Sequence, residues 1–126
     1  PLGLLRLATA CDAEGTPSRY VCEKIFRHVW CHGQDAADSE RLAALTAELA
    51  PAQDPSSAPV KQALQTHAQE AIEQGVFGVP SWVVDGRVFW GQDALPMLRA
   101  YLLGDAWFDG PDWQAPALCG VGVKRS

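Results

Sequence analysis

The fold of this chain is decided by residues 75–93, which read GVFGVPSWVVDGRVFWGQD. Asp85-Gly86 stands between two apolar runs, and this dipeptide is a strong signal for a β-hairpin because both central residues of a type I′ turn need positive φ. Gly91 follows the second run, so we expect the hairpin to end there and to lead into a helix. The implied cross-strand pairs are Val84 with Arg87, Val83 with Val88, Trp82 with Phe89, and Ser81 with Trp90.

Large apolar side chains lie on both faces of this hairpin, which predicts a sheet that is covered on both sides. Two strands alone are marginally stable in water, so further strands or a docked helix are needed. No other segment has a convincing strand pattern. We therefore expect that the chain lacks an N-terminal β-α-β segment, and that a longer gene product or a second chain completes the sheet.

Residues 1–74 are expected to form a helical subdomain. A first short helix is expected from Leu2 to near Gly15-Thr16-Pro17, and further helices over residues 18–32, 39–49 and 57–75. Ser39 is predicted to cap the third helix, and Gly75 to close the fourth. Helical spacing places the following residues inward: Val21, Ile25, Phe26, Val29 and Trp30, then Leu42, Leu45 and Leu49, then Val60, Leu64, Ala68 and Ile72.

After the hairpin, a last helix is expected from Asp93 to Leu103, with Leu95, Leu98 and Leu102 inward. Residues 75–103 would then form a β-β-α unit. Residues 104–126 are expected to be an irregular tail, with Trp107, Phe108 and Trp113 lying across the surface.

The composition is that of a globular protein of 126 residues with 48% hydrophobic residues. A net charge of −5 gives no electrostatic footprint for nucleic acid, and no apolar run approaches the ~20 residues that span a bilayer. The cysteines at positions 11, 22, 31 and 119 form no C-x-x-C motif. Free thiols in a reducing cytoplasm are therefore expected.

His28 and His32 are four residues apart on one predicted helix, a spacing that can hold zinc. No third ligand stands near them in the sequence. We therefore predict no metal site.

Pro80 stands at the entrance of the first strand, where it cannot donate to the ladder. If the Val79-Pro80 bond is cis, the N–H and carbonyl of Val79 turn outward, and a peptide-like ligand can pair with them as an added strand. The alternative is an ordinary trans proline, which local sequence alone favours.

Gln92 and Asp93 follow Gly91 where the second strand leads into the last helix. Free N–H groups at a helix start attract anions, and Asp93 could pair with a ligand ammonium. An α-amino acid head group carries both charges. The alternative is that Gln92 or Asp93 merely caps the helix.

Together, Gly-Val-Phe-Gly-Val-Pro, the hairpin and Phe-Trp-Gly-Gln-Asp resemble the C-terminal half of 2-hydroxychromene-2-carboxylate isomerases. These belong to the DsbA-like branch of the thioredoxin superfamily, beside the kappa-class glutathione transferases. The resemblance is sharp over residues 62–103, looser over 1–61, where it matches the helical insertion, and absent over 104–126. It implies an α/β, thioredoxin-like fold without its N-terminal β-α-β segment.

The resemblance also implies a glutathione site. Pro80 would be the cis-proline of the fold, Val79 would pair its backbone with the cysteinyl part of glutathione, and Gln92 and Asp93 would hold the γ-glutamyl head. The implied reaction is a glutathione-dependent cis–trans isomerisation of a small aromatic or electrophilic substrate in aromatic catabolism. A homodimer, or completion by another chain segment, is expected.

The departures from the family pattern concern catalysis. The reactive serine lies in a segment that this chain does not contain, and Ala94 stands where the family often has Arg. No catalytic residue is therefore assigned, and residues 1–126 alone are expected to be inactive and to bind glutathione weakly or not at all. The alternatives are a kappa-class transferase, a DsbA-type thiol-disulfide oxidoreductase, and a non-catalytic binding module.

Overall fold

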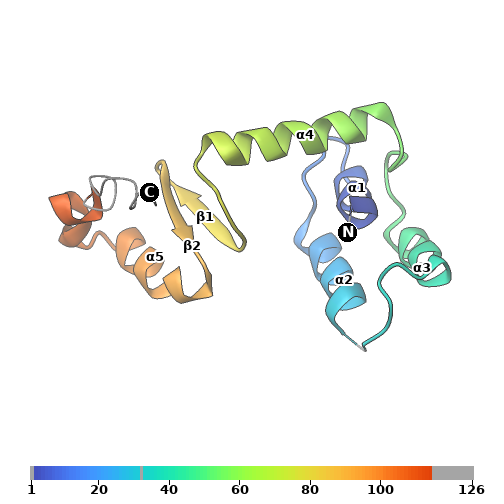
Figure 1. Cartoon of the computed structure of the whole chain (residues 1–126), viewed down its shortest axis with the longest axis horizontal. Coiled ribbons are helices and arrows are strands. Elements are labelled where there is room, and N and C mark those ends of the chain that lie inside the picture. Colours follow the sequence, from blue (N-terminus) through green and yellow to red (C-terminus); the bar gives the residue numbers. More distant parts are fainter. Residues whose placement is uncertain (1, 32, 115–126) are drawn as a thin grey trace, which may run out of the picture. The chain divides into compact units, whose positions relative to one another are not determined.

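The structure is a computed structural model that describes residues 2–31 and 33–114. The chain forms two compact units, divided between Ala71 and Ile72. We call them the helical unit and the hairpin unit and describe each by itself. Figure 1 labels their helices and strands.

The helical unit contains four helices in the order that the sequence predicts. They are α1 (Leu2–Ala10), α2 (Arg19–Trp30), α3 (Ser39–Leu49) and α4 (Ala58–Glu73), of which α4 ends just past the division between the units. The predicted helices are thus confirmed, with ends that shift by a few residues.

Side-chain caps set two of the helix starts. Ser18 Oγ accepts a hydrogen bond from the Val21 N–H at 3.4 Å and begins α2. Asp38 Oδ1 accepts one from the Arg41 N–H at 2.9 Å and begins α3. The prediction that Ser39 caps α3 is wrong, because the preceding carboxylate already satisfies the free N–H group.

The core of the helical unit is aliphatic and comes from α1, α2 and α3. Its buried residues are Leu4, Leu7, Val21, Ile25, Leu45 and Leu49. The predicted single apolar face of α2 is only partly confirmed, because Phe26 is 62% and Trp30 80% exposed. Phe26 and Trp30 each follow a core position by one residue, and one residue turns a helix by about 100°. They therefore lie beside the packed face.

The inward face of α4 also differs from the prediction. Val60 is only 1% exposed, but Ala68 and Ile72 are exposed. Steps of four residues drift by about 40° each around a helix of 3.6 residues per turn, so a row from Val60 to Ile72 leaves the packed side. Leu64 is half-buried, in line with the prediction, and so are Ala63 and His67, which lie next to Gly15.

The hairpin unit contains β1 (Ser81–Val84) and β2 (Arg87–Trp90), which pair antiparallel. The register is the predicted one at all four pairs. Asp85 and Gly86 both have positive φ, 50° and 73°, as the type I′ turn requires. In the part of the chain that the structure describes, β1 and β2 are the only strands.

A short 3₁₀ turn, η1 (Gln92–Ala94), leads into α5 (Leu95–Leu102). Leu98 is buried as predicted, but Leu95 and Leu102 are 41% and 64% exposed. The packed stripe of this short helix consists instead of Leu98 and Tyr101, which lie three residues apart and meet Phe89. Leu95 and Leu102 are seven residues apart, so they lie together on one side of that stripe.

The tail forms two further 3₁₀ turns, η2 (Ala106–Asp109) and η3 (Pro111–Gln114). Phe108 is 4% exposed and belongs to the core with Phe89 and Leu98, and Trp113 packs against that core. The prediction that these rings lie across the surface is wrong for Phe108, because Phe89 offers it an apolar surface. Residues 115–126 lie outside the described residues.

The hairpin is covered on one face only within the described residues. Phe89, with Trp82 and Val84 beside it, faces α5 and the tail. On the other face Val83 is 36% and Trp90 52% exposed. The expectation of cover on both faces is therefore not met by the described part of this chain.

Candidate functional site

The candidate site lies at the end of the hairpin where β1 begins and β2 ends. The Gly91 N–H donates a hydrogen bond to the Pro80 carbonyl oxygen at 2.9 Å. This bond continues the ladder by one step beyond the Ser81–Trp90 pair. It brings Val79-Pro80 next to the turn that carries Gln92 and Asp93, so the predicted site residues lie at one place.

Val79 presents its backbone to solvent. Its peptide bond to Pro80 is cis, as predicted, and the residue is 88% exposed. Among the described residues, no hydrogen bond uses the Val79 N–H or its carbonyl oxygen. Ser81 Oγ donates to the Gly78 carbonyl at 2.7 Å and holds the loop in place. A free donor and acceptor on a held loop can pair with an extended peptide.

The Trp90 ring packs against the loop residues Phe77 and Gly78, a contact that the sequence did not predict. A Cβ on Gly78 would lie 2.5 Å from the Trp90 Nε1 atom, so only glycine fits there. The Trp90 and Phe77 rings also contact each other, with centroids 5.0 Å apart. The sequence signal for this contact is the glycine two residues before Pro80.

Gln92 and Asp93 are exposed and follow the turn at Gly91, whose φ is +89°. The Asp93 carboxylate lies against Gly91, where a Cβ would collide with its Oδ1 atom. Neither side chain caps η1 or α5, and within residues 2–31 and 33–114 neither makes a hydrogen bond. The alternative interpretation, that these residues are helix caps, therefore has no support in the geometry. Both side chains are available to a ligand.

Other candidate groups have structural roles or are not brought together. His28 Nε2 donates to the Ala36 carbonyl oxygen at 3.0 Å, and His32 lies outside the described residues. In the described part of the chain, no three His, Cys, Asp or Glu side chains form a group that could hold a metal ion.

The described cysteines are free thiols. Burial raises the pKa of the Cys11 thiol, which lowers its thiolate content and its reactivity. Cys119 lies outside the described residues. No helix among those described has the length and apolar character needed to cross a membrane.

Two comparisons with known proteins bear on the site. The family model for the DSBA-like thioredoxin domain matches residues 2–103. A stretch of 34 residues is 50% identical to 2-hydroxychromene-2-carboxylate isomerase from Sphingobium xenophagum, and covers 27% of this chain but only 17% of that protein. No solved structure matches the chain.

Proposed function

This chain belongs to the DSBA-like thioredoxin domain family and has an α/β, thioredoxin-like fold, and we propose that it is part of a glutathione-dependent isomerase. In the proposed reaction, the glutathione thiolate adds to a conjugated carbon–carbon double bond of an aromatic intermediate. The bond rotates, and the thiolate leaves as the double bond re-forms. No net oxidation occurs, so no further redox partner is needed.

The observation that carries the proposal is the position of Val79 beside the Gln92–Asp93 turn. The free N–H and carbonyl of Val79 suit the backbone of the cysteinyl residue of glutathione. The Gly91–Pro80 hydrogen bond fixes the two segments side by side.

Asp93 and Gln92 have complementary roles toward the γ-glutamyl head. The Asp93 carboxylate suits the α-ammonium group, and the Gln92 amide N–H groups suit the α-carboxylate. Neither side chain has to release a partner within the described residues before it binds.

The 34-residue similarity to an isomerase favours this activity over a kappa-class transferase. The same similarity favours the isomerase over a disulfide oxidoreductase. We assign no catalytic residue to this chain. We propose that the whole protein is a cytoplasmic homodimer that takes a small aromatic or electrophilic substrate.

The proposal is tested by NMR titration of the ¹⁵N-labelled chain with millimolar glutathione and, separately, with the dipeptide Cys-Gly. We expect weak binding with glutathione, with amide shifts at Gly78, Val79, Gln92 and Asp93. Cys-Gly lacks the γ-glutamyl head, so the shifts at Gln92 and Asp93 should disappear while those near Val79 remain.

Asp93→Asn should weaken glutathione binding about threefold to tenfold, because it removes the charge that pairs with the ammonium group. Asp109→Asn is the matched control, since Asp109 is an exposed carboxylate in the same unit and lies outside the site. Equal shifts with glutathione and Cys-Gly, or shifts confined to other residues, would contradict the proposal.

A further inference from the structure

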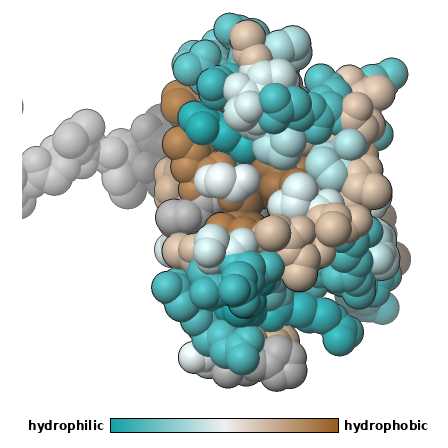
Figure 2. Space-filling view, turned by 90° about the vertical axis from the view of Figure 1, so that its right-hand side faces the viewer, coloured by the Kyte–Doolittle hydropathy of each residue, from teal (hydrophilic) through white to brown (hydrophobic). Residues whose placement is uncertain are grey.

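The helical unit contains an apolar hollow that the proposed glutathione site does not use. Its volume is about 600 Å³, within the range of pockets that bind small molecules. Figure 2 shows hydrophobic residues in a recess of one face, bordered by hydrophilic residues. The lining residues come from α1, from α2, from the loop residues 35–37 that precede α3, and from Leu42 in the first turn of α3.

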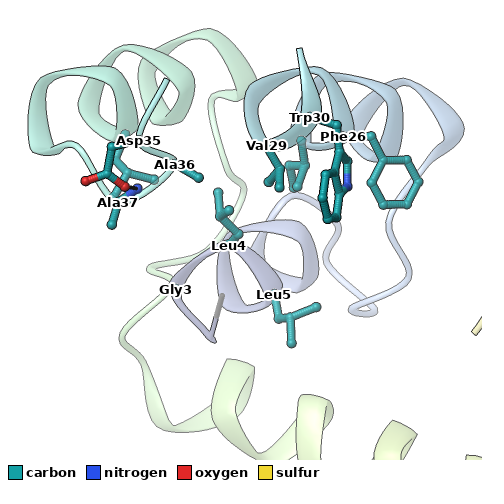
Figure 3. Close-up of a pocket in the computed structure, with 11 residues that line it drawn as sticks. Gly3, Leu4, Leu5, Phe26, Val29, Trp30, Asp35, Ala36 and Ala37 are labelled. Atoms are coloured by element: carbon teal, nitrogen blue, oxygen red, sulfur yellow. Dashed lines mark hydrogen bonds between the residues drawn. The ribbon is translucent and has the colours of Figure 1, made fainter. Parts of the chain in front are cut away.

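The hollow has a buried floor and exposed aromatic walls. Leu4 and Ile25 form the floor and are 8% and 9% exposed. Phe26 and Trp30, one helical turn apart on α2, are 62% and 80% exposed (Figure 3). A concave site with two accessible ring faces suits a flat apolar molecule, because aromatic rings gain most from offset or edge contact with other rings.

Charge is nearly absent from the lining. Asp35 is the single ionisable residue there, and its Oδ1 atom accepts a hydrogen bond from the Ala37 N–H at 2.8 Å. Figure 3 shows Asp35 at the opposite end of the hollow from Phe26. The basic residues of α2 and α3 line a different hollow, so an anionic ligand has no partner here.

From this geometry we propose that the α1–α2 hollow binds a neutral, fused-ring aromatic molecule that stacks against Trp30 and Phe26. The hollow is complete within the helical unit, so the proposal does not depend on glutathione binding. The alternative occupant is a second copy of the chain, and light scattering distinguishes it from a bound aromatic molecule.

The test uses the whole chain and the neutral dye N-phenyl-1-naphthylamine, whose fluorescence rises in apolar surroundings. We expect saturable binding in the micromolar range at one site per chain. The Trp30 indole N–H and the amides of Leu4, Leu5 and Ala36 should shift in NMR spectra, whereas the signals of Phe77 and Trp90 should not.

Trp30→Ala should lower dye affinity about tenfold, because it removes one ring face and the area that it buries. Tyr20→Ala is the matched control, since Tyr20 is a 54% exposed aromatic residue of α2 outside the hollow. Gly3→Leu is a second variant. A Cβ on Gly3 meets nothing within 4 Å, so the added side chain can fill the hollow while leucine favours the helix.

Loss of dye binding in Trp30→Ala and Gly3→Leu, with wild-type helicity and unchanged binding in Tyr20→Ala, supports the proposal. Equal loss in Tyr20→Ala, or dye shifts centred on Phe77 and Trp90, overturns it. Light scattering that shows a dimer which Trp30→Ala dissociates and the dye does not displace also overturns it, in favour of a second copy.

Discussion

The helical unit and the hairpin unit are held together by different kinds of core. The helical unit shares its burial among six aliphatic side chains from α1, α2 and α3. The hairpin unit gathers around one ring, Phe89, which is 1% exposed and contacts Tyr101, Phe108 and Trp113. Truncation to alanine costs about 2–5 kcal/mol for a buried aliphatic side chain and about 3–5 kcal/mol for a buried ring, so we expect the largest single loss at Phe89.

Each unit also has one arginine that links two of its segments, but the two arginines make different contacts. In the hairpin unit, Arg87 lies over the Tyr101 ring at 4.8 Å and donates to the Phe108 carbonyl at 3.1 Å. In the helical unit, Arg41 donates to backbone carbonyls of Asp35 and His28, and thus ties the loop before α3 to the end of α2. Arg87 thus links the tail to the hairpin, and Arg41 links the loop before α3 to the end of α2.

The largest expected effect is that of Phe89→Ala. Removing this ring should cost about 3–5 kcal/mol, because its neighbours lose their shared partner and leave a cavity. Hydrogen exchange of the amides in β1, β2 and α5 measures the loss. Phe89→Leu keeps most of the volume and should retain protection. A loss of stability in Phe89→Ala below about 1 kcal/mol would show that the core of the hairpin unit does not depend on this ring.

Arg87→Met should cost about 1–2 kcal/mol, because it removes a cation near two rings and a hydrogen bond to Phe108. Urea unfolding of the hairpin unit, followed by the NMR signal of Trp113, measures this cost. Arg87→Lys keeps the charge but not the planar fork, so it should recover only part of the stability. Full recovery would show that the charge alone matters.

The cap of α3 gives a smaller effect in the helical unit. Asp38→Ala should cost about 1 kcal/mol, and Ser39→Ala should cost close to nothing, because the Asp38 carboxylate accepts the Arg41 N–H. Thermal unfolding followed by helical circular dichroism measures both variants. A larger cost for Ser39→Ala than for Asp38→Ala would show that Ser39 is the cap, as the sequence predicts.

The smallest expected effects are on the pH dependence of stability. One group in the helical unit has a lowered pKa, and one group in the hairpin unit has a raised pKa. Hydrogen bonds from the Ser56 N–H and hydroxyl to Asp54 hold the pKa of that carboxyl below its ordinary value. This contribution to stability is present above about pH 4 and is lost as the pH falls through the lowered pKa.

In the hairpin unit, the Tyr101 hydroxyl donates to Asp85 Oδ2 at 2.6 Å, and this bond raises the pKa of the phenol. Its contribution is present below about pH 10 and is lost as the pH rises through the raised pKa. Urea midpoints between pH 2 and 11 should show that Asp54→Asn flattens only the acid limb, and Tyr101→Phe only the alkaline limb.

The sequence predicted those parts of the fold that local rules determine. Asp85-Gly86 specified the turn and therefore the register of every pair in the hairpin. The proline at position 80 and the glycine at 91 located the candidate site, because each breaks a regular element at a defined point.

The remainder depends on which surfaces meet in three dimensions. Nothing in the pattern of residues 104–114 shows that Phe108 packs on Phe89, since that contact joins positions far apart in the sequence. The exposure of Phe26 and Trp30 likewise depends on which side of α2 packs against α1 and α3. The contact of Trp90 with Gly78 could not be predicted either, because it depends on the conformation of the loop before Pro80.

The packing of Phe108 and Trp113 has a consequence for where this domain should be considered to end. The family match stops at residue 103, before either ring. The end of the family match is therefore not the end of the core of the hairpin unit. A gene trimmed to the matched region would remove Phe108 and Trp113 from the core around Phe89, and its product should be recovered in inclusion bodies. Substitutions at Phe89 and Arg87 should accordingly be constrained by Phe108 and Trp113, which lie outside the matched region.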